Sequence, residues 1–273
     1  MTQTYSLMVA PNGARRGKQD HPALPVTPEE IAQAARSSFD AGADTIHLHV
    51  RGSDRQHTLD PALYRDAMDA IEETAPDMNI QITTEAGGIY DVAAQLACLN
   101  ELRPGAASIA VREMARDPER AARVYALARE TTTRVQHILY GPDCIARLRD
   151  WCGRGLIVDT RPEVILVLGQ YAPPIAARPD MLAPMLDLLG LDRPVSWTVC
   201  AFGRAEPECL LATLRAGGNV RIGFENNIEL HDGTLFADNA ASVRAFVAAA
   251  RAEGFSPRRL APEDATSARS EAV

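Results

Sequence analysis

The sequence lacks several features that mark broad classes of protein. No apolar run approaches the ~20 residues that a membrane-spanning helix needs. The first residues, Met-Thr-Gln-Thr-Tyr-Ser, contain no basic segment followed by an apolar stretch, so we expect no secretory signal. Basic residues are in deficit, because 28 Lys and Arg stand against 36 Asp and Glu, for a net charge of −8. This balance argues against a nucleic-acid partner, which usually requires a basic face.

Cysteine is scarce as well, with an odd number of residues and no C-x-x-C spacing. The cysteines are Cys98, Cys144, Cys152, Cys200 and Cys209. Such a set disfavours a disulfide framework and fits the reducing cytoplasm. We therefore expect a soluble, cytoplasmic protein with no membrane partner. Hydrophobic residues make up 46% of the chain, which is enough for a sizeable core in one large domain or two small ones.

Short apolar runs typical of β-strands alternate with helical stretches along the chain. The expected strands are residues 5–10, 44–50, 79–84, 106–111, 134–139, 163–168, 195–200 and 219–225. The expected helices are residues 28–41, 61–74, 91–102, 118–130, 142–151, 180–189, 206–216 and 239–253. The first helix has a strong start signal, since Thr27 is a suitable N-cap, Pro28 suits the first helical position and Glu30 completes a capping box.

Eight strand–helix pairs in strict alternation predict parallel strands, because each helix supplies the crossover that a parallel pair requires. Eight such units in about 250 residues have the size of a closed (β/α)8 TIM barrel. An open doubly wound sheet is the alternative, but residues 11–14 lack the G-x-G-x-x-G spacing that usually follows its first strand. We expect a single barrel domain over residues 1–273, with a polar tail from about residue 256 that is partly irregular.

The strongest local feature is a pair of histidines in the second expected strand. Side chains alternate along a strand, so His47 and His49 share one face while Ile46, Leu48 and Val50 share the other. The aliphatic set suits the layer between barrel and helices, which directs both imidazoles inward. Two imidazoles make half of a site for zinc, copper, iron or nickel. From spacing alone, a pair of hydrogen-bonded core histidines accounts for the motif equally well.

A third metal ligand is expected at the end of another strand, where barrel active sites lie. Glu225 ends the eighth expected strand, on the same face as Arg221 and Gly223. Two histidines and one glutamate would leave coordination positions open for substrate, as catalytic metal sites do. The alternative is that Glu225 only forms an ion pair with Arg221.

These motifs together resemble the β-keto acid cleavage enzymes. The resemblance rests first on His-Leu-His-Val-Arg at 47–51 and on Gly-Gly-Asn-Val-Arg-Ile-Gly-Phe-Glu-Asn-Asn at 217–227. Further similar segments are residues 12–14, 25–30, 41–43, 83–84, 162–163, 202–204 and 238–240. The likeness extends over nearly the whole chain, and the combination is more specific than any one segment.

The resemblance implies a zinc-dependent barrel, with another divalent metal as an alternative, held by His47, His49 and Glu225. It implies a reaction in which a β-keto acid and acetyl-CoA give acetoacetate and the CoA ester of the remaining acyl group. The metal would polarise the keto oxygen, and Arg221 would pair with the substrate carboxylate or orient a base. The family also implies a homodimer or homotetramer. Hydroxyl groups at Thr84 and Ser108 are candidate substrate contacts, although polar residues are ordinary at strand ends.

The sequence departs from the family at the active face. Asn226 stands where an aspartate normally follows the metal-binding glutamate and serves as general base. Glu85 replaces an expected glycine, and residues 111–114 (Val-Arg-Glu-Met) replace a glycine-rich segment. Arg15 stands near an expected acidic position, where we predict a substrate contact, and Gly52 replaces an aspartate. The predicted metal site is therefore retained while the acid–base groups differ.

Two hypotheses follow from these departures. Glu85 supplies the missing base from a neighbouring strand, or the substrate belongs to another class that does not need the family's base. A solvated loop charge is the simpler interpretation of Glu85, and Asn226 is included among the candidate catalytic residues with Arg221. Two other functions stay open: another metal-dependent lyase or hydrolase acting on a small carboxylic acid, and a metal-binding barrel with little catalysis.

Overall fold

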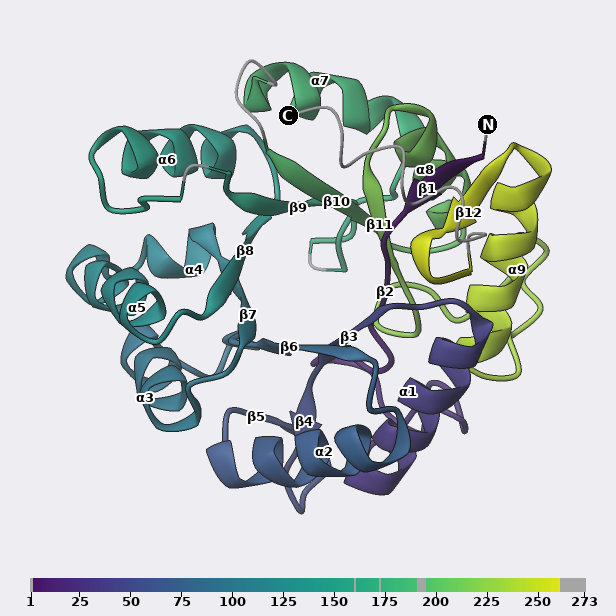
Figure 1. The fold of residues 1–273 in the computed structure, drawn as a ribbon, viewed down its shortest axis with the longest axis horizontal. Coiled ribbons are helices and arrows are strands. Elements are labelled where there is room, and N and C mark those ends of the chain that lie inside the picture. The colour runs from purple at the N-terminus through teal and green to yellow at the C-terminus, as the bar shows by residue number, and fades with distance from the viewer. Residues whose placement is uncertain (1, 160, 172, 191–194, 261–273) are drawn as a thin grey trace.

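Eight parallel strands close into a barrel in the computed structural model, which describes residues 2–159, 161–171, 173–190 and 195–260 (Figure 1). The strands are β2 (Leu7–Val9), β3 (Thr45–Leu48), β6 (Asn79–Thr83), β7 (Ala106–Ala110), β8 (Arg134–Leu139), β9 (Glu163–Leu168), β10 (Ser196–Ala201) and β11 (Asn219–Ile222). Their order around the ring follows the chain, and β11 pairs with β2 to close it. The predicted (β/α)8 barrel is confirmed.

Helices surround the barrel on its outside, each following a strand (Figure 1). They are α1 (Pro28–Ala41), α2 (Pro61–Thr74), α3 (Val92–Leu102), α5 (Pro118–Glu130), α6 (Pro142–Gly153), α7 (Leu182–Leu189), α8 (Glu206–Arg215) and α9 (Asn239–Ala252). The predicted capping box of α1 is present, because the Glu30 N–H donates to the Thr27 hydroxyl and the Glu30 carboxylate accepts the Thr27 N–H. This reciprocal pairing satisfies backbone donors that the first helical turn leaves free.

Several short elements extend the simple repeat. They are β1 (Gln3–Tyr5), the hairpin strands β4 (Val50–Arg51) and β5 (His57–Thr58), α4 (Val111–Met114), β12 (Phe255–Pro257) and the 3-10 turns η1 (Pro179–Met181) and η2 (Arg258–Leu260). Strand β12 pairs with β1, so the first residues of the polar tail from about 256 form regular structure. The rest of that tail, 261–273, lies outside the described residues.

The eighth strand ends earlier than the sequence predicts. It stops at Ile222, because Gly223 has a φ of 137° that turns the chain away from the strand direction. A side chain at Gly223 would also overlap the carbonyl of Ala10, so glycine is required here. The turn carries Glu225 off the strand and over the end of the barrel.

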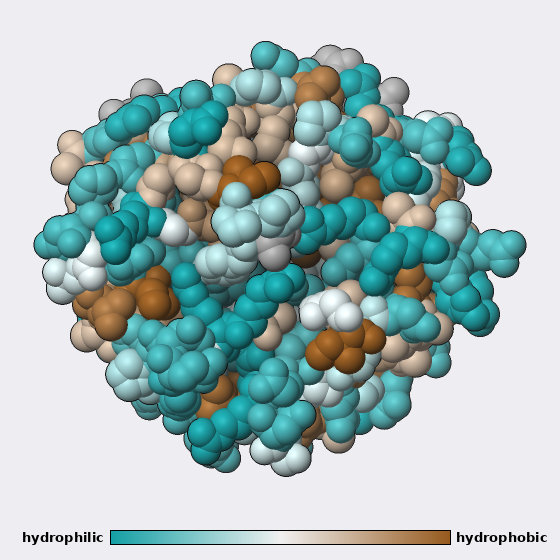
Figure 2. All heavy atoms as spheres, turned by 180° about the vertical axis from the view of Figure 1, so that it is seen from behind, coloured by the Kyte–Doolittle hydropathy of each residue, from teal (hydrophilic) through white to brown (hydrophobic). Residues whose placement is uncertain are grey.

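Two apolar layers enclose the strands. Ile46, Leu48 and Val50 belong to the large cluster between barrel and helices, as alternation predicts. A smaller cluster inside the barrel includes Ile138 and Val167. Among the described residues, none of the helices combines the length and the apolarity that crossing a bilayer would require. On the face seen from the carboxyl ends of the strands, apolar residues are scattered among hydrophilic ones around a small central hollow (Figure 2).

Candidate active site

Two histidine side chains from the end of β3 meet inside the barrel mouth. Their Nε2 atoms lie 3.2 Å apart, and both rings are almost completely buried. His47 is part of β3, whereas His49 lies between β3 and the β4–β5 hairpin. The period-two alternation of a strand carries over to His49, so both rings point to the same side.

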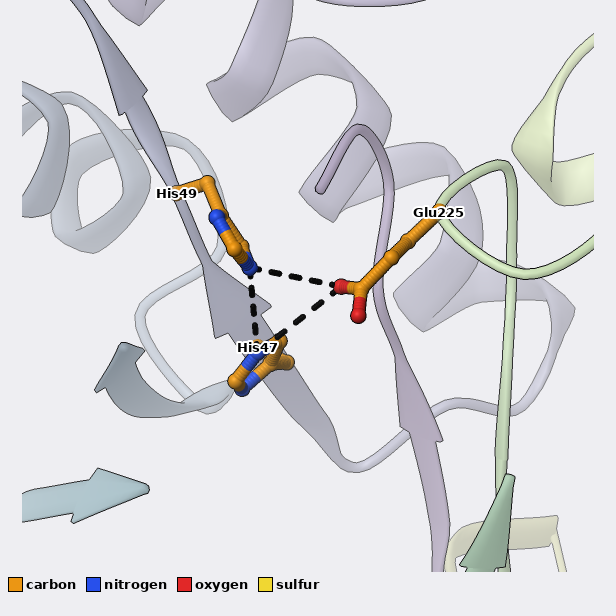
Figure 3. A group of neighbouring side chains, drawn as sticks. All are labelled: His47, His49 and Glu225. Carbon is orange, nitrogen blue, oxygen red and sulfur yellow. Dashed lines mark hydrogen bonds and ion pairs between the residues drawn. The ribbon is translucent and has the colours of Figure 1, made fainter. Parts of the chain in front are cut away.

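Glu225 completes a cluster with these histidines (Figure 3). Its Oε2 atom lies 3.4 Å from His49 Nε2 and 3.8 Å from His47 Nε2, and it makes no hydrogen bond with the described residues. Its Oε1 atom accepts a hydrogen bond of 2.7 Å from Arg221 Nη2. The sequence leaves open whether Glu225 pairs with Arg221 or belongs to a metal-ligand cluster. In the structure it does both, because Oε1 pairs with Arg221 and Oε2 faces the two histidines.

The side chain of Glu225 is held against the loop that follows β2. Gly13 has a φ of 63°, and a Cβ atom there would overlap the Glu225 side chain. Glycine is thus needed for close approach as well as for the positive φ. Asn12 supports the same loop, because its side-chain amide donates to the carbonyls of Pro25 and His49. The Asn12–Gly13 pair therefore connects the loop to both the histidine segment and Glu225.

A chain of polar side chains through the barrel interior fixes the orientation of His47. His47 Nδ1 lies 2.8 Å from Gln81 Oε1, which can only accept, so Nδ1 carries the proton and Nε2 presents a lone pair. Gln81 donates in turn to Gln136, and Gln136 donates to the Thr198 hydroxyl, each at 3.3 Å. These buried amides satisfy one another, which offsets the cost of placing them in a core.

The charge states of His47 and Glu225 leave each of them with a lone pair that a metal could use. Burial, reinforced by the Arg221 guanidinium, lowers the pKa of His47 to about 3, so this imidazole is neutral at pH 7. Burial by itself raises the pKa of Glu225, but Arg221 and the two histidines outweigh it and lower that pKa well below its usual range. Two imidazoles and a buried carboxylate oxygen match the donor set of catalytic zinc sites.

A funnel that is partly open to solvent leads down to the cluster. One wall is apolar and contains Ile138, Val167 and Phe202. Tyr140 and Tyr171 also line the funnel, and the Tyr171 hydroxyl donates to the carbonyls of residues 225 and 226. The site therefore combines a buried polar end with a partly apolar wall, as small-molecule sites usually do.

Glu85 lies at the same mouth, in the loop after β6. Its Oε2 atom is 4.0 Å from His49 Nε2, and its side chain lines the funnel. His57 Nε2 lies 2.7 Å from the Glu85 carbonyl, and the Glu85 N–H donates to the Thr83 hydroxyl. Burial and the neighbouring His49 lower the pKa of His57 to about 3, so His57 is neutral and donates from Nε2. Glu85 is thus a fixed neighbour of the cluster, not a freely solvated loop charge.

The other sequence candidates lie in different settings. Arg15 and Arg221 line the funnel. Asn226 is fully buried outside the funnel lining, and neither its side-chain nitrogen nor its oxygen has a hydrogen-bond partner among the described residues. The Thr84 hydroxyl donates to the Ser108 carbonyl, and the Ser108 hydroxyl donates to Thr83. Thr84 and Ser108 are therefore committed to neighbouring strands.

The funnel residues that the sequence does not single out as site residues include Arg16, Thr83, Tyr140 and Tyr171. Thr83 could have been predicted from the sequence. Side chains alternate along a strand, so Thr83 shares the inner face of β6 with Gln81. The tyrosines and Arg16 belong to strand ends and loops, whose side-chain directions have no periodic signal. Arg16 donates to the Phe224 carbonyl at 2.6 Å, next to the segment that carries Glu225.

A second buried carboxyl, Glu206 at the start of α8, provides a test of stability. Burial raises its pKa well above the ordinary range, although contacts with Asn227 and the Gly223 backbone oppose this. Because the folded state binds this proton more tightly than the unfolded state, its stabilising contribution is complete below the unfolded pKa of ~4.3 and is lost as pH rises through the folded value.

We therefore expect the neutral variant Glu206→Gln to raise the melting temperature at pH 8 by roughly 2–4 °C, the shift that about 1 kcal/mol produces in a chain of this size. Near pH 5 the change is expected to be smaller. Thermal unfolding at both pH values measures the effect. Glu208→Gln, a half-exposed position two residues away, is the control. A lower melting temperature for Glu206→Gln at pH 8 would contradict the buried-acid interpretation.

The fold and this site together define a class of protein. It is a (β/α)8 barrel with two imidazoles, a carboxylate and several guanidinium groups at the carboxyl ends of its strands, where the active sites of barrel enzymes lie. The chain belongs to the β-keto acid cleavage enzyme family, whose model matches residues 5–265.

Characterised relatives match this chain over most of their length. The 3-keto-5-aminohexanoate cleavage enzyme of Fusobacterium nucleatum subsp. nucleatum is 28% identical, over 97% of this chain and 96% of that protein. The 3-oxoadipate:acetyl-CoA acetyltransferase of Cupriavidus necator is 28% identical, over 89% of this chain and 87% of that protein. Among solved structures, the apo structure of ObcA has a TM-score of 0.67 at 14% identity, over 86% of this chain. This chain spans 63% of the length of ObcA, and the likeness shows the shared fold.

Proposed function

We propose that this protein cleaves a β-keto acid in an acetyl-CoA-dependent reaction, giving acetoacetate and the CoA ester of the remaining acyl group. The observation that carries the proposal is the family match over residues 5–265, joined to the cluster of His47, His49 and Glu225. The name of the Cupriavidus necator relative supplies the acetyl-CoA co-substrate. Family membership favours this reaction over the lyase, hydrolase and non-catalytic alternatives.

We infer that the cluster holds a divalent metal, with zinc as the first choice. Support comes from Glu225 Oε2, a buried anionic atom without a hydrogen bond among the described residues, directed at two imidazole nitrogens. An isolated buried carboxylate oxygen is costly unless a cation satisfies it. A metal bound there would act as a Lewis acid on the keto oxygen of the substrate and make the adjacent C–H more acidic.

The side chains around the cluster suit the remaining tasks. Arg221 is buried, holds Glu225 through Nη2 and has an Nε–H without a partner among the described residues, which suits a substrate carboxylate. Glu85 is the proposed base, because it lines the funnel beside His49, whereas an amide at Asn226 accepts no proton at neutral pH. Arg15 is a proposed contact for an anionic group of substrate or co-substrate. Ser108 is proposed to act on substrate indirectly, through its hydrogen bond to Thr83, and Thr84 is proposed to support Ser108 through the Ser108 carbonyl.

The proposed reaction is tested with the purified protein, zinc, acetyl-CoA and a panel of β-keto acids. Mass spectrometry is expected to detect acetoacetate together with a new acyl-CoA, and carbon-13 in the acetyl group is expected to appear in acetoacetate. Omission of acetyl-CoA is expected to abolish both products. Consumption of a keto acid without acetyl-CoA would favour a lyase or hydrolase instead. Absence of any turnover across the panel would contradict the proposal.

Metal binding is expected to depend on the polar chain beneath His47. Gln81→Leu removes the acceptor of the His47 Nδ1 proton, and loss of such an outer contact typically costs ~10–100-fold in metal affinity. Competition with a chromogenic chelator measures the zinc affinity directly, without any activity assay. Gln136→Leu, one step further from the cluster, is expected to have a smaller effect. Gln33→Leu, on the exposed face of α1, is the control, and equal affinities for Gln81→Leu and Gln33→Leu would contradict the role of the chain.

The family resemblance also leads us to propose a homodimer or homotetramer in the cytoplasm. Sedimentation velocity of the purified protein at micromolar concentration distinguishes these assemblies from a monomer of 29.5 kDa.

A further inference from the structure

Of the four arginines that line the funnel, one has a charged partner among the described residues. Arg221 donates to Glu225, and Arg16 donates to a backbone carbonyl. Arg15 and Arg112 make no hydrogen bond and no ion pair with the described residues. Arg15 belongs to the loop after β2, and Arg112 belongs to the short helix α4 directly after β7. The two guanidinium groups therefore come from well-separated parts of the ring of strands.

Arg112 is held in place by an aromatic ring. Its guanidinium carbon lies 3.3 Å from the centroid of the Tyr140 ring, in a cation–π contact. Such stacking uses the face of the guanidinium plane and leaves the N–H donors on its edge available. The edge of a planar guanidinium binds a carboxylate through two parallel hydrogen bonds. Arg112 is therefore oriented by the protein while its donors are available to a ligand.

An apolar wall lies along one side of the funnel, between Arg112 and Glu225. The strands on this side of the ring are β8, β9 and β10, and they present Ile138, Val167 and, just beyond β10, Phe202 to the funnel. Arg221 on β11 marks the far side of this wall. On the other side only β6 lies between β7 and the strand of His47, β3. The funnel thus places a cation opposite Glu225 in the ring, with an apolar surface along one side between them.

The charge of the funnel also favours anions. Four arginines and two glutamates line it, although the whole chain carries a net charge of −8. A divalent metal at His47, His49 and Glu225 would make the funnel still more positive. A substrate with an ammonium group at its far end would face guanidinium groups that have no ion-pair partner among the described residues, and like charges repel.

We propose that the substrate is a β-keto acid with a second carboxylate at the end of the chain remote from the keto acid, and that Arg112 binds this carboxylate. The proposal rests on the function proposed above and adds the substrate class. A phosphate of CoA has similar chemistry and is the other possible source of an anion at Arg112, so the experiment separates the two.

Three β-keto acids of matched length test the proposal, with a carboxylate, a carboxamide or an ammonium group at the far end. For the wild-type protein, kcat/KM is expected to be highest for the dicarboxylate. Arg112→Gln is expected to lower that value by ~10–100-fold, the size expected for a charged hydrogen bond, chiefly through KM. The kcat/KM for the carboxamide substrate is expected to differ little between Arg112→Gln and the wild type. Arg123→Gln, which removes the same charge from the exposed side of α5, is the control.

The co-substrate arm uses acetyl-CoA and acetyl-pantetheine, which lacks the phosphates of CoA. The KM for acetyl-CoA is expected to be the same in Arg112→Gln and wild type. A rise in the KM for acetyl-CoA that disappears with acetyl-pantetheine would assign Arg112 to a CoA phosphate and overturn the proposal. A wild-type preference for the carboxamide or ammonium substrate would also overturn it. Turnover of none of the three acids would instead contradict the proposed function, and the substrate class with it.

Discussion

His47→Ala is expected to abolish zinc binding at the cluster and to lower kcat/KM by about 10³-fold or more. The reason is that a Lewis-acid metal contributes several kcal/mol to a reaction of this kind, and each ~1.4 kcal/mol is a factor of ten in rate. The variant leaves His49 and Glu225 as two ligands, which is fewer than catalytic zinc sites use. Metal content by atomic absorption and steady-state kinetics with zinc in excess measure the two effects separately.

A second buried histidine provides a matched control. His137 lies on β8, is fully buried, packs against Tyr125 and has no hydrogen-bond partner among the described residues. His137→Ala removes the same number of buried atoms, so both variants create a cavity and lose stability. Only His47→Ala is expected to lose metal. Full zinc occupancy and wild-type kcat/KM in His47→Ala would contradict a metal role for the cluster.

The barrel was predictable because its signals are periodic. Residues 46, 48 and 50 alternate with the histidines, and the structure places that aliphatic set in the layer between strands and helices. The start of α1 was readable from Thr27 and Glu30, whose capping contacts are local. Periodicity and capping depend on near neighbours in the chain, so they survive without knowledge of the tertiary structure.

The details of the site were harder to predict from the sequence. Glu225 lies beyond the end of β11 because Gly223 turns the chain, and no alternation argument predicts that turn. Thr83, not Thr84, lines the funnel, since a one-residue difference at a strand end reverses the direction of the side chain. Arg112 belongs to a segment in which the sequence departs from the family. Its stacking on Tyr140 could not be predicted, because it depends on the adjacency of β7 and β8.

Asn226 and Glu85 are the two departures that bear most directly on catalysis. Asn226 is fully buried outside the funnel, and its backbone carbonyl accepts hydrogen bonds from the Gly203 N–H and the Tyr171 hydroxyl. These contacts use the backbone of Asn226, and its side chain does not line the funnel. Glu85 lines the funnel and is fixed through its backbone by His57 and Thr83. Glu85 is therefore the acid–base group that we propose.

Glu85→Gln is accordingly expected to lower kcat by ~10²–10⁴-fold, the usual contribution of a general base, while zinc content stays at the wild-type level. The amide is nearly the same size as the carboxyl and keeps the backbone contacts of the loop, but it accepts no proton at neutral pH. Glu73→Gln, an exposed position on α2, is the control for the loss of one negative charge.

The double variant Glu85→Gln/Asn226→Asp separates the two candidate positions for the base. Asp at 226 would be a buried carboxylate outside the funnel, so it is expected to destabilise the protein without restoring kcat. Recovery of kcat in the double variant would assign the base to position 226 and remove it from Glu85. Unimpaired turnover in the single variant Glu85→Gln would likewise show that the proton is accepted elsewhere. The expected result, loss of kcat in both variants with zinc retained, leaves Glu85 as the group that takes the proton.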